Sequence, residues 1–129
     1  MGSRIAVATT SAPKVGPFMS QAVISNGLVF SAGSLGIDPK TGKFVEGTVA
    51  DRAAQALRNL DAVFVAAGTS LSKAVKVNIY LSSMDWLPQV NEAYAEFFTT
   101  DPKPARTCVA GAVLPLNAEL EIEAVASLE

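Results

Sequence analysis

The pair Asn26-Gly27 restricts the fold of this chain more than any other short feature, because it separates two apolar runs within residues 21–33. Both residues tolerate the positive φ angles that a two-residue type I′ turn requires at its central positions. Residues 21–33 are therefore predicted to form a β-hairpin. Further along, residues 38–43 (DPKTGK) are expected to form a turn, and Phe44 with Val45 a short third strand.

A long helix is predicted over residues 48–67, where apolar side chains recur at steps of three and four residues. Thr48 and Asp51 have the spacing of an acidic capping box, in which each side chain bonds the other residue's backbone N–H. Gly68 follows the last apolar position and is a typical residue for the left-handed turn that ends a helix. Local signals therefore mark both ends of this helix.

A second helix is predicted from Trp86 to Phe98. Asp85 is expected to be its N-cap, and Pro88 is tolerated because N–H groups in the first turn have no partner within the helix. The apolar stripe of this helix would consist of Leu87, Val90, Tyr94, Phe97 and Phe98.

Residues 75–81, 106–114 and 119–128 are predicted to be strands, and the first of them alternates apolar and polar side chains from Val75 onward. The resulting order, β-β-β-α-β-α-β-β, favours an α+β fold with one mixed sheet and two helices on one face. Apolar residues such as Val125 also occur on the otherwise polar side of the strands. We therefore expect the second face of the sheet to be partly buried by another subunit.

The length of 129 residues predicts a single domain, residues 1–129, in which residues 1–12 form a loose end or an edge segment. Half of the residues are hydrophobic and 17% are charged, which is enough apolar material for a core and too little charge for a disordered chain. No uninterrupted apolar stretch of about 20 residues occurs, so no segment is expected to span a membrane.

The chain has no histidine and one cysteine, and these two counts exclude several classes of site. An intrachain disulfide, a Cys/His zinc site, and Ser-His-Asp or Cys-His catalysis are all ruled out. The formal net charge of -2, without a run of Lys and Arg, argues against a nucleic-acid partner. Any enzymatic chemistry would have to use carboxylates, arginine, hydroxyls, backbone groups and water.

Arg106 stands at the start of a predicted strand, after Pro102 and Pro104, which hold the approaching chain extended. An isolated arginine at such a place is commonly a surface residue or protects the sheet edge. The alternative is a clamp that holds a carboxylate by two parallel hydrogen bonds. Cys108 would share the strand face of Arg106, either as a small buried residue or, less commonly, as a nucleophile.

Glu119, Glu121 and Glu123 would line one face of the last strand, either as its solvated side or, at a groove between subunits, to position a water as general base. Asn91 falls on the apolar stripe of the second helix, so its buried amide would tie down a loop or donate into a site. Residues 31–36 (SAGSLG) would place glycines at a bulge or expose backbone N–H groups to an anion.

The segments GPFMSQAV, SAGSLGIDPKTGK, VNEAYAEFF, KPARTCVAGAVLP and EIEAVA follow one another between about Gly16 and Val125. On these segments the chain is identified as a member of the reactive-intermediate deaminase A family, also known as RidA, YjgF or L-PSP endoribonuclease. The resemblance implies a chorismate-mutase-like fold assembled as a homotrimer, with sites in the clefts between subunits.

The same resemblance implies an activity, the hydrolysis of reactive 2-imino acids such as 2-iminobutanoate and 2-iminopropanoate to 2-keto acids and ammonia. It implies no metal and no other cofactor. The expected partners are small 2-imino or 2-keto acids and further copies of the chain. The expected location is the cytoplasm, with the mitochondrial matrix as the alternative.

Carried over by position, Arg106 matches the family's arginine that clamps the substrate carboxylate, and Glu121 matches the glutamate that holds the attacking water. Gly33 and Cys108 match residues whose backbone contacts the substrate, and Asn91 matches an amide near the cleft. These roles are implied by the resemblance, and the five residues form the candidate site together with Phe18 and Met19.

Phe18 and Met19 stand where the family has a tyrosine, so the hydroxyl expected to touch the substrate is missing. A lost polar partner would weaken turnover or change which substrate fits. The alternative hypothesis is therefore a non-catalytic or altered-specificity member that binds small carboxylates or a protein partner. A third hypothesis, a ribonuclease or translation inhibitor, is disfavoured by the net charge and the lack of histidine.

Overall fold

A six-stranded mixed sheet forms the body of the structure, a computed structural model in which residues 3–129 are described. Its strands are β1 (Ile5–Val7), β2 (Ala22–Ser25), β3 (Leu28–Ser31), β4 (Ala74–Leu81), β5 (Ala105–Ala110) and β6 (Leu120–Ser127). They lie in the order β1-β2-β3-β6-β4-β5. The β4–β5 pair is parallel and all other neighbouring pairs are antiparallel.

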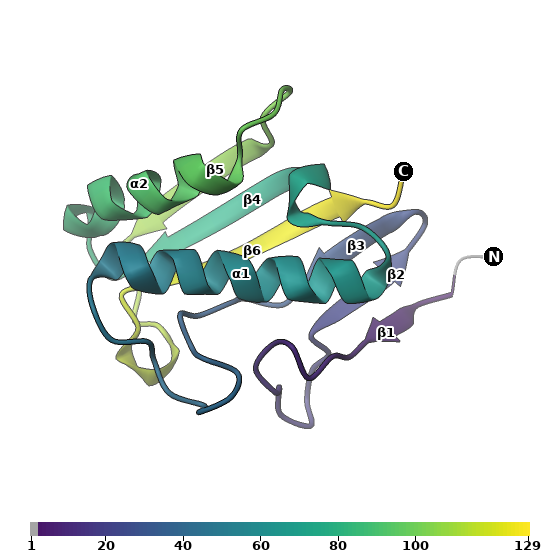
Figure 1. Ribbon diagram of the computed structural model, residues 1–129, viewed down its shortest axis with the longest axis horizontal. Helices are drawn as coiled ribbons and strands as arrows, with labels where there is room; N and C mark the ends of the chain where they lie inside the picture. Colours follow the sequence, from purple (N-terminus) through teal and green to yellow (C-terminus); the bar gives the residue numbers. More distant parts are fainter. Residues whose placement is uncertain (1–2) are drawn as a thin grey trace.

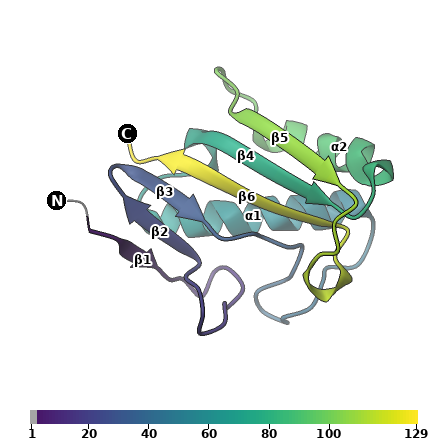
Figure 2. The ribbon, with the colours of Figure 1, turned by 180° about the vertical axis from the view of Figure 1, so that it is seen from behind.

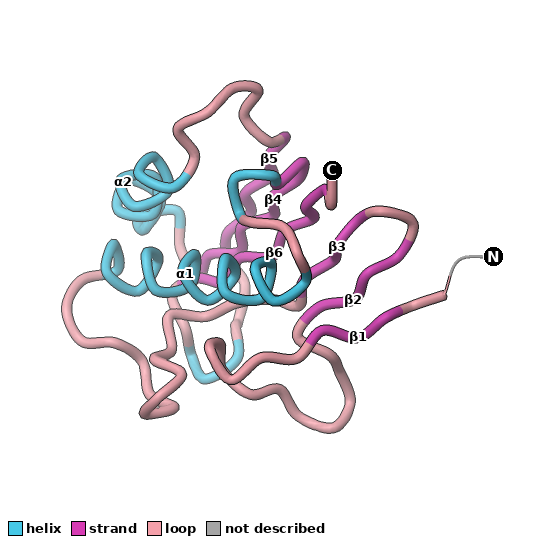
Figure 3. The backbone as a smooth tube through the Cα atoms, turned by 45° about the vertical axis from the view of Figure 1, so that its right-hand side comes forward, coloured by secondary structure: helices cyan, strands magenta, loops and turns pink. Residues whose placement is uncertain are grey.

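Two helices, α1 (Val49–Ala67) and α2 (Leu87–Phe97), cover one face of this sheet (Figure 1). The view from behind in Figure 2 shows the opposite face, which neither helix covers, and Figure 3 shows both helices to one side of the strands. The α+β fold with both helices on one face is therefore confirmed. Within residues 3–129, neither helix combines the length and the apolar character of a membrane-spanning segment.

The predicted hairpin is confirmed, because Ser25 pairs directly with Leu28 and leaves Asn26 and Gly27 as a two-residue turn. Their φ angles are 51° and 76°, as a type I′ turn requires. The third strand before α1 is not where it was predicted. Phe44 forms an isolated bridge to Ile37, because residues 38–43 fold back on themselves, with the Asp38 N–H donating to the Lys43 carbonyl at 2.8 Å.

The edge of the hairpin is instead occupied by β1, in which Ile5 pairs with Ile24. This strand lies within residues 1–12, the segment expected to be a loose end or an edge. Residues 1 and 2 of that segment lie outside the described residues.

Both ends of α1 form as predicted. The Asp51 N–H donates to the Thr48 hydroxyl (3.2 Å), the Thr48 N–H donates to the Asp51 carboxylate (2.8 Å), and Gly68 ends the helix with a φ of 100°. The expected N-cap of α2 is wrong. Asp85 lies inside a short 3-10 turn, because the Ser83 hydroxyl accepts its N–H and turns the chain before the α-helix begins at Leu87.

Two strand predictions also need correction. Val75 is 48% exposed, because a bulge between Ala74 and Lys76 inserts one extra residue and leaves Ala74, not Val75, on the inner face. The strand expected to reach residue 114 ends at Ala110. Gly111 follows with a φ of 86°, a left-handed conformation that cannot continue a strand.

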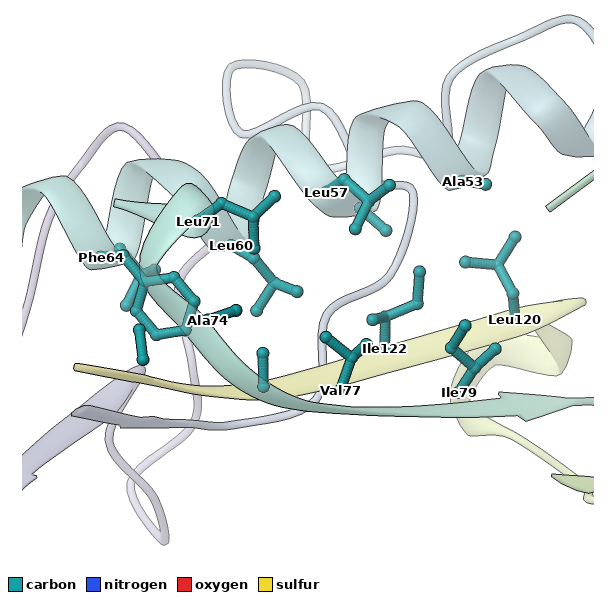
Figure 4. Close-up of a cluster of buried hydrophobic side chains, with 14 of the residues drawn as sticks. Ala53, Leu57, Leu60, Phe64, Leu71, Ala74, Val77, Ile79, Leu120 and Ile122 are labelled. Carbon is teal, nitrogen blue, oxygen red and sulfur yellow. The ribbon is translucent and has the colours of Figure 1, made fainter. Parts of the chain in front are cut away.

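The core lies between α1 and the centre of the sheet (Figure 4). Leu57, Leu60 and Phe64 of α1 point onto the strands, where side chains of β4 and β6 point back at them. The fully buried members, each with a relative exposure below 2%, include Phe64, Leu57, Leu60, Val77, Ile79, Leu120 and Ile122. Burial of each such side chain stabilises the fold by about 1.5–3 kcal/mol. The inward-facing residues of β6 are therefore held firmly, and because side chains alternate along a strand, the residues between them point to the open face.

Candidate active site

Glu121 lies on the open face of the sheet, in β6, between the inward-facing Leu120 and Ile122. Its carboxylate lies against the backbone of Gly33, so that a Cβ at position 33 would overlap Glu121 Oε2. The loop after β3 is held beside β6 because Ser34 N–H donates to the Ile122 carbonyl (2.7 Å) and Ile122 N–H donates to the Ser34 carbonyl (3.0 Å). Glycine at position 33 thus leaves the room that the carboxylate occupies.

The electrostatic surroundings of Glu121 favour its protonated form. Burial raises its pKa above the ordinary value, and the negative charge of Glu123 raises the pKa further. Glu123 accepts hydrogen bonds from Asn78 Nδ2 (3.0 Å) and from Tyr80 Oη (3.3 Å). A raised pKa makes the Glu121 carboxylate a stronger base than an ordinary carboxylate, so the group is suited to take up a proton and return it.

Arg106 lies on β5, at the edge of the sheet, and its side chain reaches α2. Its Nη1 donates to Asn91 Oδ1 at 2.8 Å, and its Cζ lies 4.8 Å from the centroid of the Tyr94 ring. Asn91 was expected to be a buried amide, but it is exposed, because it faces the guanidinium beside the sheet edge and not the core. Within residues 3–129, the Asn91 amide accepts a hydrogen bond from Arg106 and ties down no loop.

Cys108 shares the strand face of Arg106, as predicted, and is half-buried against the core. Burial raises the pKa of its thiol, and the neighbouring charge of Arg106 opposes this rise. A neutral thiol is a poor nucleophile. The surroundings of Cys108 therefore favour a small packed residue over a nucleophile.

Arg106 and Glu121 lie on opposite faces of the sheet within one chain. The register pairs Tyr80 with Glu121 on one side and with Val109 on the other, so these three side chains share the open face. Arg106, an odd number of positions from Val109, projects from the opposite face. A single chain therefore does not bring the two candidate catalytic residues together.

Phe18 and Met19 lie on the loop between β1 and β2, where their side chains are 100% and 57% exposed. Sequence reasoning missed the residue that anchors this loop. The amide of Gln21 is buried and bonds the backbone of Thr9 (Oε1 to N, 2.7 Å) and of Pro13 (Nε2 to O, 2.9 Å). A lone amide at the start of a strand gives no local signal of such a role.

Glu119 does not share a face with Glu121 and Glu123, contrary to the prediction. It precedes β6 and forms an ion pair with Arg52 of α1, with Nη2 to Oε2 at 2.8 Å. Arg52 also donates to the Gly47 carbonyl at 3.1 Å. Glu119 thus links α1 to the sheet, and two of the three glutamates remain on the open face.

A largely apolar cavity of about 140 Å³ lies between residues 12–15, the loop after β3 and α1. Gly33 lines it, but neither Arg106 nor Glu121 does. The buried amide of Asn59 at its wall already bonds the carbonyls of Leu35 and Ile37. We therefore assign the candidate site to Glu121 and its neighbours.

Within residues 3–129, no three His, Cys, Asp or Glu side chains gather closely enough to hold a metal ion.

The sequence profile of the family described as Endoribonuclease L-PSP matches residues 9–128, nearly the whole chain. The chain belongs to this family, also known as RidA. The RidA-family relative Reactive Intermediate Deaminase A, chloroplastic, of Arabidopsis thaliana is 45% identical over 123 residues, covering 95% of this chain and 65% of the relative. The 2-iminobutanoate/2-iminopropanoate deaminase of Dermatophagoides farinae is 38% identical over 130 residues, covering 100% of both chains.

Solved structures show the same RidA-family fold. The crystal structure of E. coli TdcF with bound serine matches with a TM-score of 0.86 at 33% identity, covering 95% of this chain and 98% of that one. The family expected from the sequence segments is therefore confirmed.

Proposed function

We propose that this chain is an imine deaminase, which hydrolyses reactive 2-imino acids such as 2-iminobutanoate and 2-iminopropanoate to 2-keto acids and ammonia. The observation that carries the proposal is the Glu121 carboxylate, which lies against the Gly33 backbone and has a raised pKa. A carboxylate in this state can receive a proton from an attacking water. Two relatives support the proposal, one named a reactive intermediate deaminase and the other a 2-iminobutanoate/2-iminopropanoate deaminase.

Arg106 would hold the substrate by its carboxylate. Nη1 is bonded to Asn91, and the opposite edge of the planar guanidinium can offer two parallel N–H groups to a carboxylate. The serine bound to the E. coli relative carries a carboxylate of this kind. Fixing one end of the substrate places its imine carbon in a defined position for attack.

Hydrolysis would then proceed in two proton transfers through Glu121. Glu121 takes a proton from water as the water oxygen bonds to the iminium carbon, and the C=N electrons return to nitrogen. Glu121 then gives that proton to the amino nitrogen, and the C–N bond breaks to release ammonia. The hydroxyl oxygen becomes the keto oxygen, and the hydroxyl proton passes to the ammonia to form ammonium. The iminium carbon is already electrophilic, so positioning and one base supply the catalysis.

The proposed site lies between copies of the chain in a homotrimer. Arg106 and Glu121 face opposite sides of one sheet, and β5 is an edge strand that a neighbouring copy can approach. Phe30 and Val109 on the open face are 43% and 46% exposed in the single chain. With one cysteine and no intrachain disulfide, the chain suits the reducing cytoplasm or mitochondrial matrix, where we propose that it acts.

One observation favours an alternative function. Phe18 and Met19 supply no hydroxyl on the loop where the family's tyrosine was expected, and Phe18 is fully exposed. A member without that hydroxyl would bind small carboxylates without hydrolysing an imine.

A coupled assay distinguishes the two functions. An amino-acid dehydratase generates 2-aminoacrylate and its imine from serine, and semicarbazide traps the imine that this chain has not yet hydrolysed. The wild type is expected to suppress trapping, whereas Arg106→Ala and Glu121→Gln should slow turnover by about 100-fold or more. Arg58→Ala serves as the matched control, since Arg58 is exposed on α1 and, among residues 3–129, its side chain hydrogen-bonds only to Gln55.

Full activity in Arg106→Ala would overturn the assignment of the clamp. A folded, trimeric wild type that binds 2-oxobutanoate but leaves trapping unchanged would support the non-catalytic alternative.

A further inference from the structure

The guanidinium of Arg106 is held by two residues of α2, although Arg106 itself is exposed. Asn91 accepts its Nη1 hydrogen bond at 2.8 Å, and the Tyr94 ring lies under its Cζ at 4.8 Å. Asn91 and Tyr94 are three residues apart on the helix, so they are neighbours on its surface. One residue thus fixes an edge of the guanidinium, and the other lies against its flat face.

The Tyr94 ring is itself held in place. Its centroid lies 4.2 Å from that of Phe98 in a stacked arrangement with 26° between the ring planes. Phe98 is 6% exposed and belongs to the core. Because Phe98 and the guanidinium cannot occupy the same face of the ring, Tyr94 lies between them. The orientation of Arg106 is therefore coupled through Tyr94 to the packed interior.

A free arginine side chain samples many rotamers and loses that freedom when it binds a carboxylate. A guanidinium already stacked on an aromatic face has lost much of it beforehand, so binding costs less. The cation–π attraction between Arg106 and Tyr94 adds to this preference.

We propose that Tyr94 is a positioning residue for the carboxylate clamp: its ring holds the guanidinium of Arg106 so that the edge not bonded to Asn91 faces the substrate. This inference rests on the proposed function in one respect only, that the ligand of Arg106 is a 2-imino or 2-keto acid. The ring face, and not the hydroxyl, performs the role, since no hydrogen bond joins Tyr94 Oη to Arg106 within residues 3–129.

The test compares three variants. Tyr94→Leu removes the ring, Tyr94→Phe keeps the ring and removes the hydroxyl, and Phe97→Leu makes the same aromatic-to-leucine change on α2 at a residue that packs against the core. Two measurements are made on each: calorimetry gives the Kd for 2-oxobutanoate, and steady-state kinetics give kcat and KM for the imine. A third, the ¹Hε chemical shift of Arg106, reports whether the guanidinium lies over a ring and needs no activity.

Tyr94→Leu is expected to raise the Kd and the KM by about two- to fivefold while kcat changes little, because a substrate that has bound is still held by the Arg106 guanidinium itself. Its Arg106 Hε signal should lose the upfield ring-current shift of the wild type. Tyr94→Phe and Phe97→Leu should both behave as the wild type does.

Wild-type affinity in a folded Tyr94→Leu variant would overturn the proposal, and so would an equal loss in Tyr94→Phe. If Tyr94→Leu fails to fold, the wild-type Hε signal decides alone: an unshifted position would overturn the stacked geometry. A wild type that hydrolyses no imine refutes the proposed function, but the Kd comparison still tests Tyr94.

Discussion

At the scale of single residues, the pKa of Glu121 depends on a second carboxylate, Glu123, two positions along the same strand. Burial is the largest cause of its raised pKa, and the charge of Glu123 is the other. Tyr80, the register partner of Glu121, also lies on this face, and burial and Glu123 raise the pKa of its hydroxyl so that it stays neutral. Glu121 must be ionised to take a proton from water, so its raised pKa limits activity at acid pH.

Glu123→Gln is therefore expected to move the acid limb of the kcat/KM profile to lower pH. Removing the negative charge removes one of the two causes that raise the pKa of Glu121, while the Gln side-chain oxygen can still accept the hydrogen bond from Asn78. The profile is recorded from about pH 3 to about pH 8, on both sides of the ordinary carboxyl range. Glu96→Gln, exposed on α2, is the control, and an acid limb that stays in place or rises would contradict the explanation.

At the scale of elements, α1 positions much of the core and is fixed at its start by the capping box of Thr48 and Asp51. Hydrogen bonds from Thr48, first from its backbone N–H and then from its hydroxyl, lower the pKa of Asp51. A carboxyl whose pKa is lowered on folding stabilises the fold above its ordinary pKa, and this stabilisation is lost as the pH falls through the lowered value.

Thr48→Ala should lower the free energy of unfolding at pH 7 by about 1 kcal/mol, because the Asp51 N–H loses the hydroxyl that accepts its hydrogen bond. The deficit relative to wild type should shrink in acid, where Asp51 is protonated in both proteins. Urea unfolding at one fixed protein concentration measures it, since assembly makes stability depend on concentration. Thr100→Ala, in an exposed loop, is the control, and a deficit of equal size there would remove the cap as the cause.

At the scale of the whole molecule, the open face of the sheet is the surface that the single chain leaves uncovered. It carries Phe30 and Val109 beside the polar cluster of Asn78, Tyr80 and Glu123. An exposed face that mixes large apolar groups with bonded polar groups is typical of a surface that meets another protein chain. The proposed trimer would cover this face.

Val109→Glu is expected to dissociate the trimer and to abolish turnover, because a charge would be buried without a partner at the interface. Light scattering after size-exclusion chromatography measures the mass, which for the wild type should be three times that of one chain. Val65→Glu, at a 59% exposed position on the outer side of α1, is the matched control and should leave both mass and turnover unchanged. A wild type with the mass of one chain at micromolar concentration would contradict the trimer.

Much of the fold can be predicted from the sequence, because the residues that determine these elements lie close together along the chain. The turn at Asn26-Gly27 needs only the φ preferences of two residues, and the start of α1 needs only Thr48 and Asp51, three positions apart. The family segments also point to Arg106 as a candidate without any coordinates. In each case the deciding interaction lies within a few residues of the chain.

The tertiary structure decided what depends on partners distant in sequence. The bulge that exposes Val75 arises from pairing with β6. Glu119 turns away from the open face because its carboxylate accepts hydrogen bonds from Arg52, 67 positions away in the sequence. Only the sheet register places Arg106 and Glu121 on opposite faces. No local pattern encodes these pairings, since they are set by the packing free energy of strands and helices that meet only in the folded chain.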